Sequence, residues 1–216
     1  MPRVFSRLHP SLSSALDERG WNPPPVQEHV LPDVMDGHDR LVIAPTGSGK
    51  TMAGILPLFH RCLSEEWPSL SILYITPLRA RNRDVDRRLT ELAEAVGLRV
   101  DVRHGDTTQA QRAKQTRKPP NLLVTTPETF QLMFSGKNLR AMLSTVQAVV
   151  VDEVHDLAAS ARGWQLGVGL SRLEALAGRS VQRLGLSATV GNPDAVANWL
   201  SPGKAKPLIT TGQRIT

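Results

Sequence analysis

The sequence predicts an α/β domain in which a mostly parallel β-sheet carries helices on both faces. Short, almost purely apolar runs alternate along the chain with longer segments of helical periodicity. The apolar runs lack the polar alternation of half-exposed strands, which is typical of a parallel sheet covered on both sides. With 216 residues, the chain is long enough for one well-buried domain of this kind.

The strands and helices follow from these two patterns. The expected strands are 41–44, 72–76, 98–102, 122–126, 148–151 and 183–186. Helical spacing near the N-terminus joins Leu8, Leu12 and Leu16, ahead of Gly20. Two further apolar stripes predict amphipathic helices: Val85, Leu89, Leu92 and Val96, and then Leu166, Leu170, Leu173 and Ala177.

Proline, glycine and charge mark the expected loops. The segments 23–25, 119–120 and 201–207 are rich in Pro, Gly or Lys, and the last is expected to lead out of the domain. A basic stretch is expected to form a mobile surface loop, and it contains Arg112, Lys114, Arg117 and Lys118.

Composition narrows the class of protein. Lys and Arg total 26 against 20 Asp and Glu, and the net charge of +6 favours an anionic partner such as nucleic acid. The single cysteine, Cys62, excludes an internal disulfide framework and fits a reducing, cytoplasmic environment. No apolar run approaches the roughly 18 residues that cross a bilayer, so a membrane protein is excluded.

A phosphate-binding loop is the strongest motif. The segment APTGSGKT at 44–51 follows an expected strand and opens a helix. Its glycines let backbone amides wrap around phosphates at the positive end of the helix dipole. The lysine would contact the β- and γ-phosphates of ATP, and the final hydroxyl would bind Mg²⁺. The candidate nucleotide-binding residues are Thr46, Gly47, Ser48, Gly49, Lys50 and Thr51.

Two further motifs follow strands that should end at the same edge of the sheet. Asp152 and Glu153 open the sequence DEVH directly after the run AVVV. A carboxylate there can hold Mg²⁺ opposite Thr51, which makes Thr51 and Asp152 the candidate metal ligands, and Glu153 would orient or deprotonate the attacking water. The tripeptide Ser187-Ala188-Thr189 follows the run RLGL. Alone it would indicate a turn or a helix cap, but its order after the other two motifs suggests a shared site.

With these motifs the chain resembles the first RecA-like domain of superfamily 2 helicases, and most closely the archaeal and bacterial large helicase-related (Lhr) group. The resemblance covers nearly the whole chain. It also rests on Gln27 after a proline run, TPLRAR at 76–81, HGDT at 104–107, TTPET at 125–129 and the pair Arg162-Gly163. A neighbouring group of 3′ to 5′ DNA-unwinding DExH helicases remains an alternative. The implied fold is a RecA-like P-loop NTPase domain.

The resemblance implies a role for each matching position. Gln27 would pair with adenine, with Trp21 as a stacking or packing neighbour. Lys50, Asp152, Glu153 and His155 would form the catalytic set, whereas His155, Ser187 and Thr189 would couple hydrolysis to strand movement. The residues matching motifs that grip the tracked strand are Thr76, Pro77, Arg79, Arg81, Thr126, Pro127 and Glu128, although Arg81 stands where the family more often has an aliphatic residue.

One argument for strand binding does not depend on the resemblance. Arg79, Arg81 and Arg83 fall near the start of an expected helix, where positive charge is unfavourable. A nucleic-acid phosphate would be attracted both to these guanidinium groups and to the helix amides. The alternative is a solvated face partly neutralised by Asp84 and Asp86.

The resulting hypothesis is an ATP- and Mg²⁺-dependent motor domain of a DNA helicase of the repair or recombination type, moving 3′ to 5′ on single-stranded DNA. An RNA or RNA–DNA helicase, or a translocase that does not separate strands, remains open. A small-molecule kinase or a non-hydrolysing scaffold fits less well. Residues 1–38 are expected to be N-terminal helices carrying Gln27, 39–203 the RecA-like domain, and 204–216 the start of a linker to a second RecA-like domain. That domain would supply arginine fingers, so this chain alone should hydrolyse ATP poorly.

Overall fold

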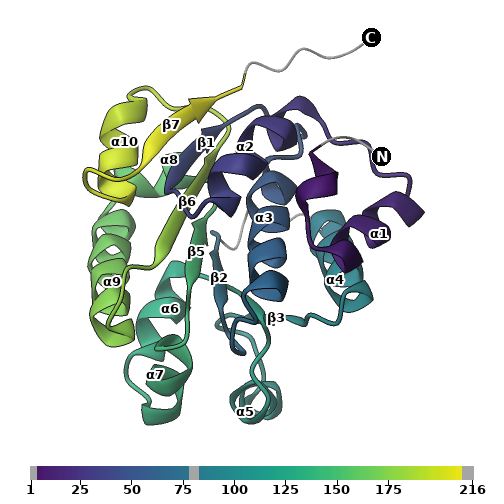
Figure 1. Ribbon diagram of the computed structural model, residues 1–216. Coiled ribbons are helices and arrows are strands. Elements are labelled where there is room, and N and C mark those ends of the chain that lie inside the picture. The colour runs from purple at the N-terminus through teal and green to yellow at the C-terminus, as the bar shows by residue number, and fades with distance from the viewer. Residues whose placement is uncertain (1–3, 78–82, 211–216) are drawn as a thin grey trace.

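A seven-stranded, wholly parallel sheet organises the chain (Figure 1). The computed structural model describes residues 4–77 and 83–210, and in the second range it describes side chains from Arg87 onwards. The strand order is β3-β4-β2-β5-β6-β1-β7. The strands are β1 (Arg40–Ile43), β2 (Ile72–Ile75), β3 (Val100–Arg103), β4 (Leu122–Thr125), β5 (Ala148–Val151), β6 (Gln182–Ser187) and β7 (Lys206–Ile209).

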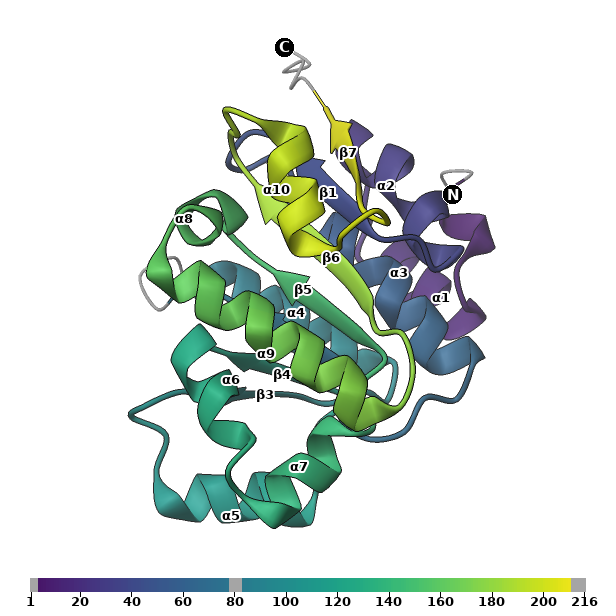
Figure 2. The same cartoon turned by 90° about the vertical axis from the view of Figure 1, so that its left-hand side faces the viewer.

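Helices cover both faces of this sheet, as Figure 2 shows. One face carries a short 3₁₀ helix and the first four α-helices: η1 (Phe5–Arg7), α1 (Pro10–Glu18), α2 (Pro25–Met35), α3 (Lys50–Ser64) and α4 (Arg83–Ala95). The opposite face carries α6 (Pro127–Met133), α7 (Lys137–Leu143), α8 (Val154–Ala158), α9 (Ala161–Ala177) and α10 (Pro193–Leu200). Helix α5 (Gln109–Arg117) lies near the β3 end of the sheet.

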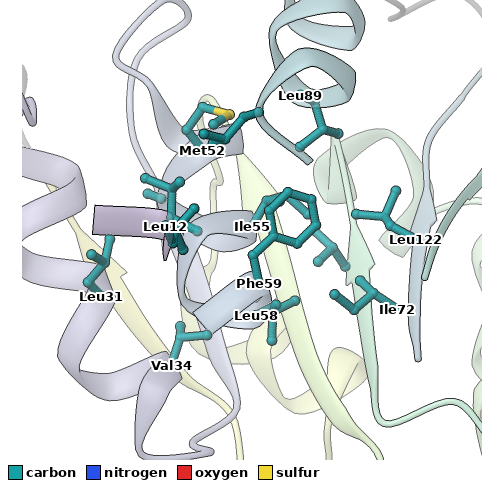
Figure 3. Close-up of a cluster of buried hydrophobic side chains, with 14 of the residues drawn as sticks. Leu12, Leu31, Val34, Met52, Ile55, Leu58, Phe59, Ile72, Leu89 and Leu122 are labelled. Atoms are coloured by element: carbon teal, nitrogen blue, oxygen red, sulfur yellow. The ribbon is translucent and has the colours of Figure 1, made fainter. Parts of the chain in front are cut away.

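The two faces have separate hydrophobic cores because successive strand side chains point to opposite sides. In β2, Ile72 belongs to the α3 side and Leu73 to the α9 side. Phe59 of α3 is fully buried in the core on the α3 side of the sheet, among Leu12, Ile72 and Leu122 (Figure 3). These contacts clamp α3, and therefore the loop that precedes it, against the sheet.

The predicted fold class is confirmed, and so are all six expected strands, whose bounds shift by no more than two residues. The stripe residues Leu89, Leu92 and Leu170 are buried. The side chain of Val85 lies outside the described residues.

One expected loop is wrong and another is wrong in part: residues 201–205 form turns as expected, but a strand follows them. The segment 201–207 includes the start of β7, which pairs with β1 as an edge strand and places Pro207 opposite Leu41. Its sequence, KPLI, lacks a continuous apolar run because only one side of the strand is paired and its side chains are not fully buried. The basic stretch around Arg112 is helix α5, which begins with a capping box between Thr108 and Gln111.

The described part of the chain contains no helix long and apolar enough to cross a membrane.

Candidate functional site at the carboxyl edge of the sheet

The sheet order brings the sequence motifs together. Strand β6 lies between β1 and β5, so the loop after β1, the acids after β5 and Ser187 at the end of β6 meet at one edge. Strands β2 and β4 continue the sheet beyond β5 and add Thr76 and Thr126 to the same edge. Ligands of parallel α/β sheets bind at this carboxyl edge.

The loop before α3 has the geometry of a phosphate cradle. Gly47 and Gly49 have φ angles of 79° and 88°, a left-handed conformation that favours glycine. A Cβ at Gly49 would lie 2.9 Å from Pro24 Cγ and 3.1 Å from Gln27 Nε2. Ser48 Oγ is buried and has no hydrogen-bond partner among the described residues. An oxygen-rich anion would supply that partner, so the loop fits a nucleotide phosphate.

Gln27 links the N-terminal helices to this loop. Its side chain is fully buried; its Nε2 donates to the Gly49 carbonyl at 3.4 Å, and its Oε1 accepts a hydrogen bond from Trp21 Nε1 at 3.1 Å. Trp21 therefore has a hydrogen-bonding role that the sequence did not reveal. Each terminal amide atom of Gln27 retains capacity for one further hydrogen bond, which is what pairing with adenine requires.

Asp152 and Glu153 directly follow β5 at its carboxyl end. Oδ1 of the largely buried Asp152 accepts from the Glu153 backbone amide at 2.9 Å, and Oδ2 accepts from the Tyr74 hydroxyl at 2.5 Å. Burial raises the pKa of Asp152, while these hydrogen bonds and the Lys50 charge oppose that rise. Burial, and then the Asp152 charge, raise the pKa of Tyr74 well above its usual range, so its hydroxyl keeps the proton that it donates.

Glu153 occupies the centre of the edge. Its Oε1 lies 4.0 Å from Lys50 Nζ, and its Oε2 lies 3.5 Å from His155 Nδ1. Burial, and next the charge of Asp152, raise the pKa of Glu153, which suits a group that must accept a proton. Its φ of 46° is left-handed, a costly conformation for a glutamate and one that is often found at functional sites.

A polar connection joins the acids to the end of β6. His155 Nδ1 lies 2.9 Å from Ser187 Oγ, and Ser187 Oγ donates to the Thr189 carbonyl at 3.0 Å. A proton on His155 Nδ1 satisfies both contacts, because Ser187 then accepts from the histidine and donates to Thr189. The Thr189 side chain itself is exposed.

Among the residues expected to grip nucleic acid, those that the structure describes directly follow β2 and β4, which are neighbours in the sheet. Thr76 N donates to the Thr125 carbonyl, and both Thr76 and Thr126 are buried, the latter capping α6. Pro77 and Pro127 follow them and are buried as well. Arg79 and Arg81 lie outside the described residues.

Arg103, which lies near the ends of these two strands, was not singled out from the sequence. A small hollow at the edge is lined by Thr76, Thr126, Arg103 and His104. Burial and the nearby Arg112 charge lower the pKa of Arg103. Only the surroundings of Arg103 in the folded chain distinguish it from the other arginines.

Glu128 forms an ion pair with Arg162, whose Nε lies 2.6 Å from Glu128 Oε1. Burial alone would raise the pKa of Glu128, but the hydrogen bond and charge of Arg162, together with hydrogen bonds from its own backbone amide and from Thr126, lower that pKa overall. A carboxylate repels phosphate, so the contact of Glu128 with Arg162 offers it a role in holding that guanidinium in place. The sequence placed these residues in separate motifs.

The donor set at the edge suits a cation shared with phosphates. The described residues contain no group of three or more His, Cys, Asp or Glu that could hold a metal ion. Thr51 and Asp152 offer one hydroxyl and one carboxylate. Mg²⁺ in nucleotide sites is commonly held by one or two such groups together with phosphate oxygens and water.

The phosphate cradle, the acid pair and the parallel sheet define a RecA-like P-loop nucleotide-binding domain. The family model described as DEAD/DEAH box helicase matches residues 24–196. The chain therefore belongs to that family, as the first RecA-like domain of a superfamily 2 helicase.

Relatives within the family include proteins of the Lhr group. The Lhr helicase/probable uracil glycosylase of Mycolicibacterium smegmatis is 42% identical over 83% of this chain and 13% of its own length. The ATP-dependent helicase Lhr-Core of Methanothermobacter thermautotrophicus is 36% identical over 91% of this chain and 25% of its own. The chain thus spans a quarter or less of these two proteins.

Solved structures show the same fold. The structure of Mycobacterium smegmatis helicase Lhr bound to ssDNA and AMP-PNP matches with a TM-score of 0.84 and 37% identity, over 98% of this chain and 28% of that one. The DEAD-box helicase Mss116 bound to ssRNA and UDP-BeF matches with a TM-score of 0.82 over 94% of this chain and 43% of that one. At 19% identity, the latter supports the fold alone.

Proposed function

We propose that this chain is the ATP-binding motor domain of an ATP-dependent helicase that acts on single-stranded nucleic acid, with DNA favoured. One observation carries the proposal: an unbroken series of polar contacts runs from Lys50 through Glu153 and His155 to Ser187. A site that only stored nucleotide would not need a connection from the phosphate cradle to a neighbouring strand.

In this proposal the residues divide the work of ATP hydrolysis. The cradle of Thr46, Gly47, Ser48 and Gly49 holds the phosphates, and Gln27 selects adenine. Lys50 neutralises charge on the β- and γ-phosphates, while Thr51 and Asp152 hold Mg²⁺, which supplies charge stabilisation during phosphoryl transfer. Glu153 orients and deprotonates the attacking water, and its raised pKa favours that role.

In this proposal the coupling of ATP hydrolysis to movement of the bound nucleic-acid strand would fall to His155, Ser187 and Thr189. Because His155 contacts both Glu153 and Ser187, a change at the γ-phosphate can alter the position of the β6 end. The nucleic-acid strand would be held by Thr76, Pro77, Arg79, Arg81, Thr126, Pro127 and Glu128. Glu128 would act through Arg162. Contacts of this kind address the backbone and carry little base specificity.

The proposal extends to a longer protein and its setting. A second RecA-like domain of the same protein would complete the ATP site with arginine fingers. The division into 1–38, 39–203 and 204–216 belongs to this proposal, although β7 ties Lys206–Ile209 to the sheet. Movement 3′ to 5′ and a cytoplasmic role in DNA repair or recombination are its most specific form. RNA or RNA–DNA unwinding, or translocation without strand separation, is the alternative.

The coupling is tested in the complete natural protein that contains residues 1–216. Ser187→Ala removes the hydroxyl that His155 contacts but leaves the cradle and Glu153 in place. We expect ATP hydrolysis to persist while displacement of a labelled strand from a 3′-tailed DNA duplex falls by about tenfold or more. A 5′-tailed duplex and the matching RNA substrates test polarity and sugar preference. Equal losses of hydrolysis and displacement would contradict a coupling role, and hydrolysis without displacement by the unaltered protein would favour a translocase.

A further inference from the structure

Tyr74 is a buried polar residue that belongs to none of the sequence motifs. It lies in β2, between β4 and β5, and its side chain is 6% exposed. Its neighbours in register are Val124 and Val150, so packing alone would accept a phenylalanine. The hydroxyl is what distinguishes this position. Burying it is unfavourable unless it finds hydrogen-bond partners.

Those partners are the two candidate metal ligands. The Tyr74 hydroxyl donates to Asp152 Oδ2 at 2.5 Å, and the Thr51 side chain is its second hydrogen-bonding neighbour. Asp152 Oδ1 is already fixed by the Glu153 amide at 2.9 Å. Thus this buried phenol of β2 lies between a side chain of α3 and one that directly follows β5 at the carboxyl edge.

We propose that Tyr74 is a positioning residue for the Mg²⁺ site, a role that rests on the proposed function of Thr51 and Asp152 as ligands. In this role the Tyr74 hydroxyl donates to Asp152, and its oxygen would accept a hydrogen bond from the Thr51 hydroxyl, which lowers the pKa of Tyr74. This arrangement leaves lone pairs of the Thr51 and Asp152 oxygens free for the cation. Groups that orient metal ligands in this way contribute strongly to metal affinity.

The test measures nucleotide affinity rather than hydrolysis. A fluorescent ADP analogue is titrated into the 216-residue chain, once with Mg²⁺ and once with EDTA, and the ratio of the two affinities reports the contribution of the metal. Tyr74→Phe removes only the hydroxyl. Asp152→Asn tests the metal site itself. Ser71→Ala is the matched control because it deletes another buried hydroxyl at the opposite end of the same strand.

We expect Tyr74→Phe to lower the Mg²⁺-dependent ratio by about tenfold or more, with little change in EDTA, while Ser71→Ala leaves the ratio intact. If Tyr74→Phe retains the ratio, or weakens binding equally with and without Mg²⁺, its role is structural and the inference is overturned. If Asp152→Asn also retains the ratio, the proposed metal role is itself wrong. The two failures are therefore distinguishable.

Discussion

Gly163 determines how closely α8 and α9 can approach. A Cβ at this position would overlap the Leu157 carbonyl oxygen at the end of α8. Since that contact is with backbone, no rotamer change relieves it. Gly163→Ala should therefore destabilise the domain by about 1–3 kcal/mol, as measured by chemical denaturation. Gly167→Ala on the same helix is the control, because its Cβ would meet only Trp199 Nε1 at 3.7 Å. Equal effects of the two substitutions would contradict this reasoning.

Helix α5 is more than a basic surface element. The Arg112 guanidinium donates to the carbonyls of His104, Gly105 and Thr107 and so holds the turn after β3. Arg112→Gln should raise amide hydrogen exchange in residues 104–107 by about fivefold or more, since each lost hydrogen bond contributes roughly 1 kcal/mol. Lys114→Gln removes the same charge from an exposed position of the helix and should leave hydrogen exchange in residues 104–107 unchanged. Similar exchange in both variants would show that charge, and not anchoring, matters.

The same elements show what the sequence could predict. Strands β1 and β5 were predictable because burial on both faces leaves nearly continuous apolar runs, and their motifs follow directly. Strand β7 and helix α5 could not be predicted from the sequence. A partly exposed edge strand leaves no apolar pattern, and neither does a helix that buries only Gln115. The role of Tyr74 depends on a partner 78 residues away in the chain, which periodicity cannot indicate.

The whole molecule carries a net charge of +6, which should make binding to nucleic acid depend on salt. If the carboxyl edge grips phosphates, the affinity for a labelled single-stranded oligonucleotide should fall linearly with the logarithm of salt concentration, with a slope near −0.7 per phosphate contact. Fluorescence anisotropy at several salt concentrations measures this slope. Affinity that is independent of salt would contradict a backbone-directed grip.

We expect nucleic acid to drive ATP hydrolysis at the edge built around Glu153. The most direct test is ATP turnover by the complete natural protein that contains residues 1–216, with and without single-stranded DNA, beside its Glu153→Gln variant. Glu153→Gln preserves the shape of the side chain but removes its ability to accept a proton. We predict turnover that DNA stimulates and that falls by about 10²-fold or more in the variant. Turnover indifferent to DNA, or unchanged by the substitution, would contradict the account.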